Sequence, residues 1–387
     1  MKEVRFGIIG VGSMGSIHAR NLIAGTIQHA RLAALCDSEP KQLAKFENTL
    51  LKFEDSRKLI RSGEVDAVLI ATPHYGHTSI GADALSVGMH TLVEKPISVH
   101  KADAQRLIAA RKSKKTIFAA MFNQRTDPHY IKLRELIRSG ELGEITRINW
   151  IITDWFRTQA YYEGGGWRAT WGGEGGGVLL NQCPHNLDLM QWLFGMPVRV
   201  RAFCGIGKRH NIEVEDEVTA YLEYDNGATG VFITTTGEAP GTNRLEVTAE
   251  RGKVVVEAGK ITWTRNTVGQ TEFLKTSPNA FARPDIWTID IPCGDSGGQH
   301  NEVLQNFTDA ILDGTPLIAP AEEGIHSVEL GTAMLYSSFT GKTVDLPLDA
   351  VAYERHLKKL IKSSTFVKKV KSNVGKEVDL SSSFGKA

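Results

Sequence analysis

Residues 4–15 read V-R-F-G-I-I-G-V-G-S-M-G, and this stretch decides the fold of the first half of the chain. An apolar, β-prone run leads directly into the spacing Gly10-x-Gly12-x-x-Gly15, and helix-like residues follow. This order predicts a buried strand, a tight turn and a helix start. Gly10 turns the chain, Gly12 leaves room for a pyrophosphate, and Gly15 allows the helix to pack on the strand. The alternative is a glycine-rich turn without function, so the context of the motif matters.

The same stretch predicts a dinucleotide site. The free N–H groups at the helix start, around Ser13 and Met14, would face the phosphates. Residues 31–37 read as a second strand that ends in Asp37, 22 residues after Gly15, where a carboxylate can accept hydrogen bonds from a ribose. No arginine follows Asp37 to bind a 2′-phosphate, which favours NAD over NADP. The alternative is that Asp37 only caps the next helix.

Length and composition describe an ordinary globular protein. The chain has 387 residues, enough for two domains, with 41% apolar residues, 23% charged residues and a net charge of +1. We therefore expect no nucleic acid and no membrane surface as a partner. The four cysteines lie far apart without a C-x-x-C pair, and neither a signal peptide nor an apolar run of about 18 residues is recognisable. These features predict a cytoplasmic protein without a metal site.

Further strand and helix patterns alternate up to residue 123. Strands are predicted at residues 65–73, 89–93 and 116–122, with helices between them, which indicates an α/β fold with a doubly wound parallel sheet. Ligands of such sheets bind beyond the carboxyl ends of the strands. The cofactor edge is therefore predicted to collect, besides the glycine turn and Asp37, the residues Thr72, Pro73, His77, Glu94, Lys95 and Asn123.

The pattern changes after residue 123. Several short strands joined by hairpin turns such as Asp225-Asn226-Gly227 predict an α+β domain with a large, mostly antiparallel open sheet. The expected boundaries are 1–123 for the nucleotide-binding domain, 124–350 for a substrate-binding and oligomerisation domain, and 351–387 for a lysine-rich helix and tail. We expect this last part, which contains Lys358, Lys368 and Lys376, to be a solvated helix and a loose tail.

Together these motifs resemble the Gfo/Idh/MocA oxidoreductase family. The resemblance rests on the glycine motif, Ala71-Thr72-Pro73 with His77, Glu94-Lys95-Pro96, and Gly175-Gly176-Gly177 through His185 and Asp188. It implies an NAD-dependent enzyme that needs no metal, with Lys95 in catalysis. It also implies a homodimer or homotetramer formed through the open face of the second sheet.

The second-half motif contains the other candidate catalytic residue. Asn181, His185 and Asp188 are spaced i, i+4, i+7, which places them on one helix face. Pro184 weakens this prediction, because the helix can kink or begin there. The family has an aspartate where this chain has Asn181, and an asparagine can only orient groups by hydrogen bonding. His185 could also be a core histidine, and Asp188 could be a partner or cap.

Residues 154–171 combine flat aromatic and hydrogen-bonding side chains. Trp155 and Trp167 can stack on the C–H faces of a sugar, while Arg157 and Arg168 can bond its hydroxyls. The alternative is a packed aromatic cluster.

These features predict hydride transfer between NAD and a secondary alcohol of a sugar, glycoside or cyclic polyol such as inositol. His185 is the first candidate for the acid/base and Lys95 the second, and Asn123, Arg157, Trp167, Arg168, Asn181 and Asp188 are candidates for substrate binding. Two alternatives stay open: an NAD-dependent glycosidase that acts by transient oxidation and elimination, and a non-catalytic NAD-responsive regulator.

Overall fold

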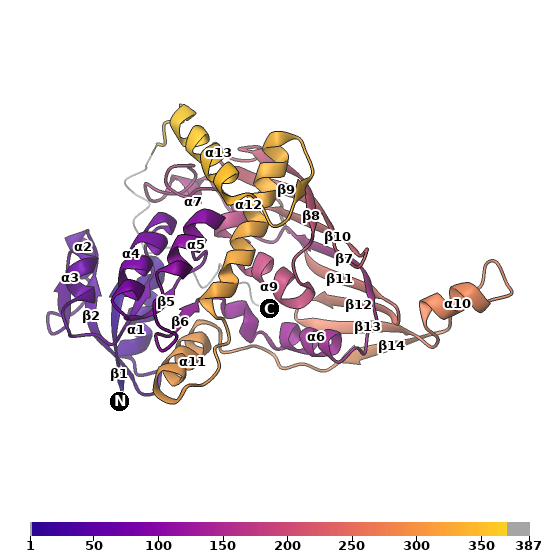
Figure 1. The fold of residues 1–387 in the computed structure, drawn as a ribbon, viewed down its shortest axis with the longest axis horizontal. Helices are drawn as coiled ribbons and strands as arrows, with labels where there is room; N and C mark the ends of the chain where they lie inside the picture. The colour runs from indigo at the N-terminus through magenta and orange to yellow at the C-terminus, as the bar shows by residue number, and fades with distance from the viewer. Residues whose placement is uncertain (1, 370–387) are drawn as a thin grey trace.

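Two β-sheets organise residues 2–369, which are the residues that the computed structural model describes. In Figure 1 the first sheet lies at the left in indigo and purple, and the second lies at the right in pink and orange. Each sheet has its own hydrophobic core.

The first sheet is parallel and has the strand order β3-β2-β1-β4-β5-β6. Buried apolar side chains cover both of its faces, as a parallel sheet requires. The predicted doubly wound α/β domain is confirmed. The short strand β3 is missing from the prediction, because three residues carry too little periodicity to be recognised. The elements are β1 (Val4–Ile9), α1 (Ser13–Ile23), β2 (Ala30–Cys36), α2 (Pro40–Leu43), β3 (Leu51–Phe53), α3 (Ser56–Ile60), β4 (Ala67–Ile70), α4 (His74–Ser86), β5 (His90–Val93), α5 (Lys101–Ala109) and β6 (Phe118–Ala120).

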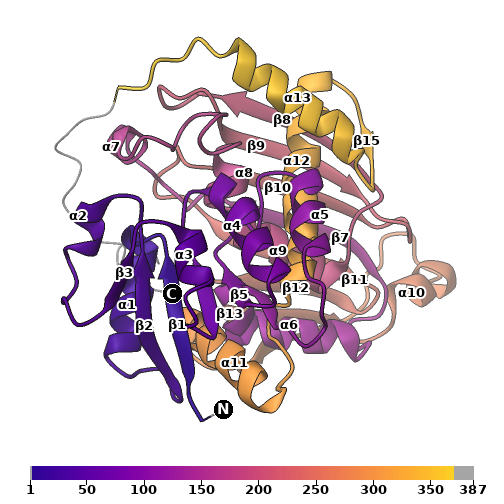
Figure 2. The same ribbon diagram turned by 60° about the vertical axis from the view of Figure 1, so that its left-hand side comes forward.

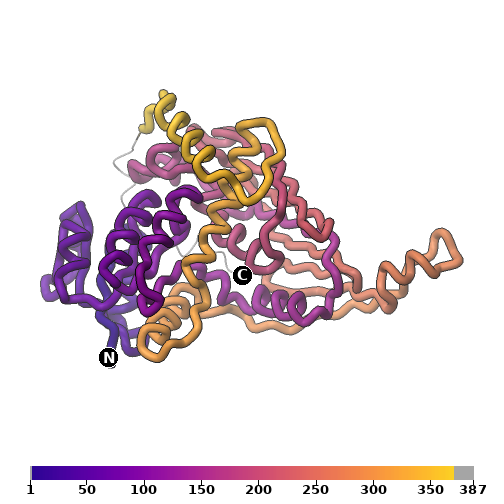
Figure 3. Tube along the Cα trace, viewed as in Figure 1, coloured from indigo at the N-terminus to yellow at the C-terminus, as the bar shows by residue number. Residues whose placement is uncertain are grey.

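One helix from late in the chain completes the first domain. Helix α11 (Gln299–Asp313) packs on the first sheet, where Phe307 is fully buried and its ring centroid lies 6.0 Å from that of Phe6. Figure 3 shows this orange segment beside the indigo N-terminal part. Sequence position alone placed α11 in the second domain, whereas its apolar face belongs to the first core.

The second sheet has nine strands in the order β14-β13-β12-β11-β7-β10-β9-β8-β15. All neighbouring pairs are antiparallel except β7 and β10, so the predicted mostly antiparallel sheet is confirmed. The strands are β7 (Ile145–Ile152), β8 (Arg199–Ile206), β9 (Glu215–Glu223), β10 (Thr229–Thr235), β11 (Asn243–Ala249), β12 (Gly252–Glu257), β13 (Lys260–Asn266), β14 (Ile286–Ile291) and β15 (Val344–Asp345).

Helices cover one face of this sheet and leave the other face open. Buried and exposed residues alternate along β9, as expected for a strand with one face in a core. In Figure 1 the helices lie to the left of the strands, and no helix of residues 2–369 covers their right-hand face. The remaining elements are η1 (Asn123–Thr126), α6 (Pro128–Arg138), α7 (Gln159–Glu163), α8 (Val178–Asn181), α9 (Pro184–Phe194), α10 (Gln270–Thr276), η2 (Ala321–Glu323), α12 (Gly324–Thr340) and α13 (Ala350–Ser363).

Helix α13 is not the solvated helix that the lysine count predicts. Asp349 caps its N-terminus, and Tyr353 and Leu357 are buried in the core of the second domain. Figure 2 shows α13, in yellow, above α12, and the Tyr336 and Tyr353 rings of these helices have centroids 6.1 Å apart. Apolar residues at helical spacing decided its packing, while its lysines occupy the opposite side. Lys376 lies outside the described residues.

Residues 2–369 contain neither a membrane-spanning helix nor a cluster of metal ligands. None of their helices combines the length and the apolar character that crossing a bilayer requires. Within the same residues, His, Cys, Asp and Glu side chains form no group of three that could hold a metal ion.

Candidate active site

The glycine turn has the shape of a phosphate cradle. Gly10 has φ = +90°, and a Cβ atom on Gly15 would lie 1.9 Å from the Gly10 carbonyl oxygen, so both positions require glycine. A Cβ atom on Gly12 would meet no atom within 4 Å, which means that Gly12 faces open space. Helix α1 begins at Ser13 and Met14 with no side chain capping it, so its N–H groups can receive an anion.

Asp37 lies beside this turn and is partly exposed at the end of β2. Its Oδ2 accepts a hydrogen bond from the Val11 N–H at 2.7 Å, and its Oδ1 accepts one from the Glu39 N–H at 2.9 Å. Each carboxylate oxygen has a further lone pair for a ribose hydroxyl. Asp37 therefore does not cap α2, whose N-cap is Glu39, and instead joins the glycine turn to the end of β2.

His77 and Glu94 hold the loops at the ends of β4 and β5. Both ring nitrogens of His77 lie 2.7 Å from carbonyl oxygens, one of Thr72 and one of Pro96. Glu94 is buried, and its Oε1 lies 2.8 Å from His18 Nε2. Burial acts to raise the pKa of Glu94, but the hydrogen bond and charge of His18 lower it to about 2. Glu94 is thus a carboxylate, and its negative charge lies next to Lys95.

Lys95 reaches from the end of β5 to the second domain. Its Nζ donates a hydrogen bond to the Asn181 carbonyl oxygen at 2.7 Å. Burial lowers the pKa of Lys95, Glu94 acts to raise it, and the positive charges of Arg168 and Arg157 lower it further. The two arginines of the aromatic loop therefore lie close enough to influence Lys95.

His185 lies beside Lys95 on a helix that begins at Pro184. The helical segment is divided into α8 and α9, and α9 begins at Pro184 as one of the two predicted alternatives has it, because Pro184 cannot donate to the Leu180 carbonyl. His185 is 5% exposed. Burial lowers its pKa well below the ordinary value, and the charges of Lys95 and His300 lower it further. His185 is consequently a neutral base at pH 7.

Asp188 has a different partner from the one the helical spacing suggested. Both of its carboxylate oxygens accept hydrogen bonds from Arg125, at 2.7 Å each, and both residues are buried. Burial raises the pKa of Asp188, and the charge of Arg125 acts in the opposite direction. This bidentate pair joins α9 to η1, which favours the partner role over substrate contact.

Several buried polar atoms near this edge have no hydrogen-bond partner among residues 2–369, and three of them can face a nucleotide. These three belong to Thr72, Asn123 and His185, namely Oγ1, Oδ1 and Nδ1. The amide nitrogen of Asn123 donates to Gln299 Oε1 at 2.6 Å, which leaves its oxygen free to accept. Donors and acceptors of this kind match the amide and ribose groups of a nicotinamide nucleotide, so the residues present fit NAD.

The aromatic loop splits into a packed half and a partly exposed half. Tyr162 and Trp171 are buried in the core, as the packing alternative predicts. Trp167 and Arg168 are partly exposed, and the Trp167 ring lies edge-on to His74 with centroids 5.0 Å apart. Arg157 stacks over Trp155 and Tyr161, with its guanidinium carbon 5.5 and 5.3 Å from the ring centroids.

Comparisons with known proteins agree with this geometry. Residues 4–122 match the model of an oxidoreductase family with an NAD-binding Rossmann fold, and residues 130–255 match the GFO/IDH/MocA C-terminal domain. The chain belongs to the Gfo/Idh/MocA family.

Similar proteins include an inositol dehydrogenase and a protein of rhizopine catabolism. Myo-inositol 2-dehydrogenase of Thermotoga maritima is 27% identical over 265 residues, which cover 66% of this chain and 75% of that protein. The rhizopine catabolism protein MocA of Rhizobium meliloti is 31% identical over 196 residues, covering 50% of this chain and 58% of MocA.

Solved structures of the Gfo/Idh/MocA fold superpose on most of the chain. The WlbA dehydrogenase of Bordetella pertussis, in complex with NADH and UDP-GlcNAcA, has a TM-score of 0.75 at 25% identity and covers 90% of this chain and 100% of that one. Levoglucosan dehydrogenase, in complex with NADH and levoglucosan, has a TM-score of 0.72 at 21% identity, covers 89% of this chain and 100% of its own, and shares the fold.

Three residues of this Gfo/Idh/MocA protein are missing from the sequence-based site. His74 begins α4, His300 lies at the start of α11, and Glu174 precedes the glycine triplet. His300 affects the pKa of both Glu94 and His185, and its ring centroid lies 5.7 Å from that of His18, so it belongs to the same cluster. His300 is far from the other residues in sequence and no motif marks it. Glu174 adjoins a recognised motif, which is the one signal that could have indicated it.

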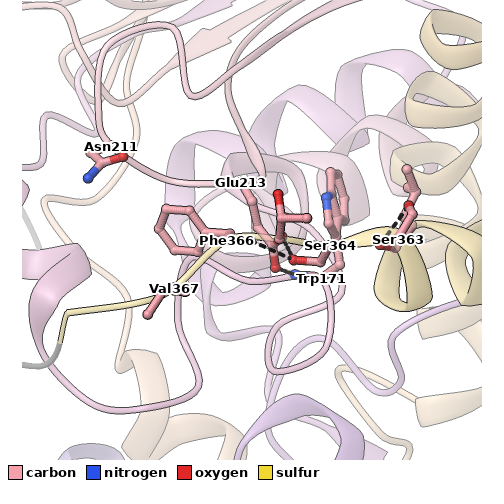
Figure 4. A pocket seen from close by; sticks show the side chains of 9 residues that line it. Trp171, Asn211, Glu213, Ser363, Ser364, Phe366 and Val367 are labelled. Atoms are coloured by element: carbon pink, nitrogen blue, oxygen red, sulfur yellow. Dashed lines mark hydrogen bonds between the residues drawn. The ribbon is translucent and has the colours of Figure 1, made fainter.

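A pocket lies between the end of the aromatic loop and the segment after α13. Its lining includes Trp171 and Glu213 from the second domain and Ser364 and Phe366 from the segment after α13 (Figure 4). The Glu213 carboxylate accepts from the Trp171 N–H at 2.9 Å and from the Ser364 hydroxyl. The segment after α13 therefore holds one end of the aromatic loop.

Proposed function

We propose that this protein is an NAD-dependent dehydrogenase that oxidises a secondary alcohol of a sugar, glycoside or cyclic polyol, or reduces the corresponding ketone. The observation that carries the proposal is the placement of Lys95 beside a neutral, buried His185 at the carboxyl edge of the Rossmann sheet. The names of the inositol dehydrogenases support the class of substrate.

The two residues divide the proton chemistry. When bound, NAD supplies the hydride acceptor. Lys95 donates a hydrogen bond to the hydroxyl oxygen of the substrate and stabilises the negative charge that develops there. His185 removes the hydroxyl proton, because its lowered pKa keeps the ring neutral and able to accept. In the reducing direction the same atoms act in reverse.

The aromatic loop supplies the contacts that suit a sugar. Trp167 and Arg168 are partly exposed, and the charge of Arg168 acts on Lys95, so a sugar ring can stack on the indole while the guanidinium bonds hydroxyls. Asn181 takes part indirectly, because its carbonyl oxygen already accepts from Lys95.

A substrate panel tests the proposal. Sugars, glycosides and inositols are incubated with NAD or NADP, and nicotinamide reduction is followed by absorbance. We expect reduction of NAD with at least one class and weaker reaction with NADP, because Asp37 would repel a 2′-phosphate. Glycosidic bond cleavage without net NADH would indicate elimination chemistry instead. NAD binding with no reaction across the panel would favour a regulator.

We also propose that the open face of the second sheet joins copies of this chain. The large side chains Phe203 and Tyr221 on this face are 63% and 42% exposed. A sheet face with exposed aromatic residues is a typical subunit interface.

A further inference from the structure

Glu174 is a buried carboxyl group that has no part in the reaction described so far. It is 1% exposed and lies immediately before Gly175-Gly176-Gly177. Its Oε2 accepts a hydrogen bond from the Ala169 N–H at 2.7 Å, and its Oε1 accepts one from the side-chain amide of Asn181. Both bonds use the carboxyl group as an acceptor, which suits its ionised form.

Asn181 connects Glu174 to Lys95 through hydrogen bonds to both residues. Its amide nitrogen donates to Glu174, its side-chain oxygen accepts from the Tyr161 hydroxyl at 3.3 Å, and its main-chain oxygen accepts from Lys95 Nζ at 2.7 Å. Every hydrogen-bonding group of Asn181 that faces the site is therefore engaged. Rotation of the Asn181 side-chain amide would break its contacts with both Glu174 and Tyr161.

Glu174 also holds the turn of the aromatic loop. Ala169 has φ = +66°, a left-handed conformation that residues other than glycine rarely adopt. The Ala169 N–H donates to Glu174, and this residue directly follows Trp167 and Arg168 in the chain. The carboxylate thus stabilises the turn that directly follows these two side chains.

We propose that Glu174 is a positioning residue that couples the substrate loop to the catalytic lysine through Asn181, and that its negative charge favours the charged form of Lys95. This inference rests on the dehydrogenase function proposed above. The family pattern has an aspartate where this chain has Asn181, and in this chain Glu174 supplies a carboxylate next to that position.

The electrostatic surroundings of Glu174 include both signs of charge. Arg168 of the same loop and Lys368 after α13 are positive, as is Lys95 at the end of β5. Glu215 of β9 is the neighbouring carboxyl group, Tyr162 of α7 lies nearby, and His74 of α4 faces the Glu174 main-chain oxygen through Nδ1 at 3.0 Å. His74 is neutral, because burial lowers its pKa well below the ordinary value.

These surroundings give the coupling a pH dependence. Burial raises the pKa of Glu174 to about 7, although Asn181, the Ala169 N–H and the positive charges of Arg168 and Lys368 oppose this. Glu174 therefore ionises near neutral pH. Its ionised form raises the pKa of Lys95, so the lysine is more fully charged above pH 7 than it would be beside a neutral residue.

Glu174→Gln tests the inference with little change in volume. The glutamine side chain has one acceptor oxygen and one NH₂ group, so it cannot accept from both Ala169 and Asn181 unless the Asn181 amide rotates away from Tyr161. We expect kcat to fall about 10- to 100-fold through mispositioning, and the ionisation near pH 7 to disappear from the kcat profile.

Asn181→Asp and the double variant Glu174→Gln/Asn181→Asp complete the experiment. The single variant puts two carboxyl groups against each other, so one must hold a proton, and we expect a similar loss of kcat. The double variant exchanges the positions of the amide and the carboxylate, since the introduced glutamine can accept from Ala169 and donate to the introduced aspartate. We expect it to recover most of the lost activity.

The matched control is Glu215→Gln. Glu215 is equally buried, and burial raises its pKa to about 7 as well, but it accepts from the Gly177 and Leu179 N–H groups at 2.8 and 3.0 Å rather than from Asn181. We expect Glu215→Gln to lower the thermal stability of the protein and to leave the pH profile of kcat unchanged. An equal effect of both variants on that profile would reduce Glu174 to a structural role.

A second measurement separates this inference from the proposed function. The pKa of Lys95 is measured in the protein without cofactor or substrate, by pulse reductive methylation at a series of pH values followed by mass spectrometry of the peptide. Glu174→Gln should lower this pKa by removing a nearby negative charge. An unchanged value would overturn the inference whether or not any substrate is found, whereas a lowered value beside an inactive substrate panel would overturn only the proposed function.

Discussion

The side chains of Lys95 and His185 occupy one polar cluster, but their surroundings make them suited to different tasks. Burial disfavours the charged form of both, so both pKa values fall from their ordinary values. The lower pKa makes His185 a neutral base, while Lys95 keeps a donor at Nζ that bonds the Asn181 carbonyl oxygen. A hydrogen-bond donor and a neutral base in one cluster suit alcohol oxidation.

Replacing either residue should remove turnover and leave NAD bound. We expect His185→Ala and Lys95→Ala to lower kcat by about 10²- to 10⁴-fold. His185 must be neutral to accept a proton, so activity is lost as pH falls through its pKa, and this limb should lie below about pH 6.5. His129→Ala is the control, because burial lowers the pKa of His129 to about 4 in a helix outside the site.

The pH profiles distinguish the two roles. The limb below about pH 6.5 should vanish in His185→Ala, while the ionisation of Glu174 near pH 7 should remain. In a Lys95→Gln variant with residual activity, the limb should move to higher pH, because a positive neighbour of His185 has been removed. Near-full activity of both alanine variants would refute the catalytic assignment and favour the regulator.

Replacing Asp188 tests whether its role is to pair with Arg125 or to contact the substrate. Asp188→Asn leaves Arg125 buried with half of its bidentate contact, so we expect a loss of unfolding free energy of about 3 kcal/mol in urea titrations. Asp83→Asn breaks the bidentate pair with Arg61 on the surface and should cost about 1 kcal/mol or less. A stable Asp188→Asn protein with a raised KM would show that Asp188 contacts the substrate after all.

Among the structural elements, the glycine turn before α1 contains two glycines with different roles. Gly15 has a packing role, and we expect Gly12 to have a binding role. Gly15 is required for packing of α1 on β1, while Gly12 faces open space. The turn and the start of α1 together form the phosphate cradle.

Gly12→Val should abolish NAD binding in a calorimetric titration and leave the thermal midpoint nearly unchanged, because the added side chain occupies the space of the pyrophosphate. Gly15→Val is the matched variant and should lower the thermal midpoint as well, since its Cβ would collide with the Gly10 carbonyl. Normal NAD binding by Gly12→Val would mean that the turn is not the phosphate site.

The aromatic loop is the element expected to select the substrate. Trp167→Ala and Arg168→Ala should raise KM about 10-fold or more with little change in NAD affinity, because these side chains would contact substrate alone. Tyr162→Phe is the control, since its hydroxyl bonds Thr236 within the core. Unchanged KM in both test variants would give the whole loop a packing role.

At the scale of the whole molecule, the two sheets present their faces differently. Helices cover both faces of the first sheet, whereas the second sheet keeps one face without a helix among the described residues. An exposed apolar sheet face is a liability for a monomer, which is the physical reason to expect a second copy on it.

Light scattering after size exclusion should therefore give a dimer or tetramer. The double variant Phe203→Glu/Tyr221→Lys places charges on the open face and should shift the protein to a monomer, because unpaired charges are costly to bury. Val87→Glu, at an exposed apolar position after α4, should leave the assembly intact. A wild-type monomer at micromolar concentration would contradict the proposed interface.

Features that depend on local geometry can be predicted from the sequence alone. Strand and helix periodicity, the glycine spacing, the end of β2 at Asp37 and the start of α9 at Pro184 all follow from a few adjacent residues. The carboxyl-edge rule for parallel sheets then brought Lys95, Thr72 and Asn123 to one side of the molecule without coordinates.

Side-chain partners and pKa values that depend on contacts between distant segments are visible only in the folded protein. Helix spacing placed Asn181 and Asp188 together, but the break at Pro184 and the charge of Arg125 separated them. The packing of α11 on the first sheet brought His300 to the site from far along the chain, and the buried contact between Glu174 and Asn181 has no signature in either segment. Burial and partner charges set pKa values, and both are properties of the folded chain rather than of any stretch of it.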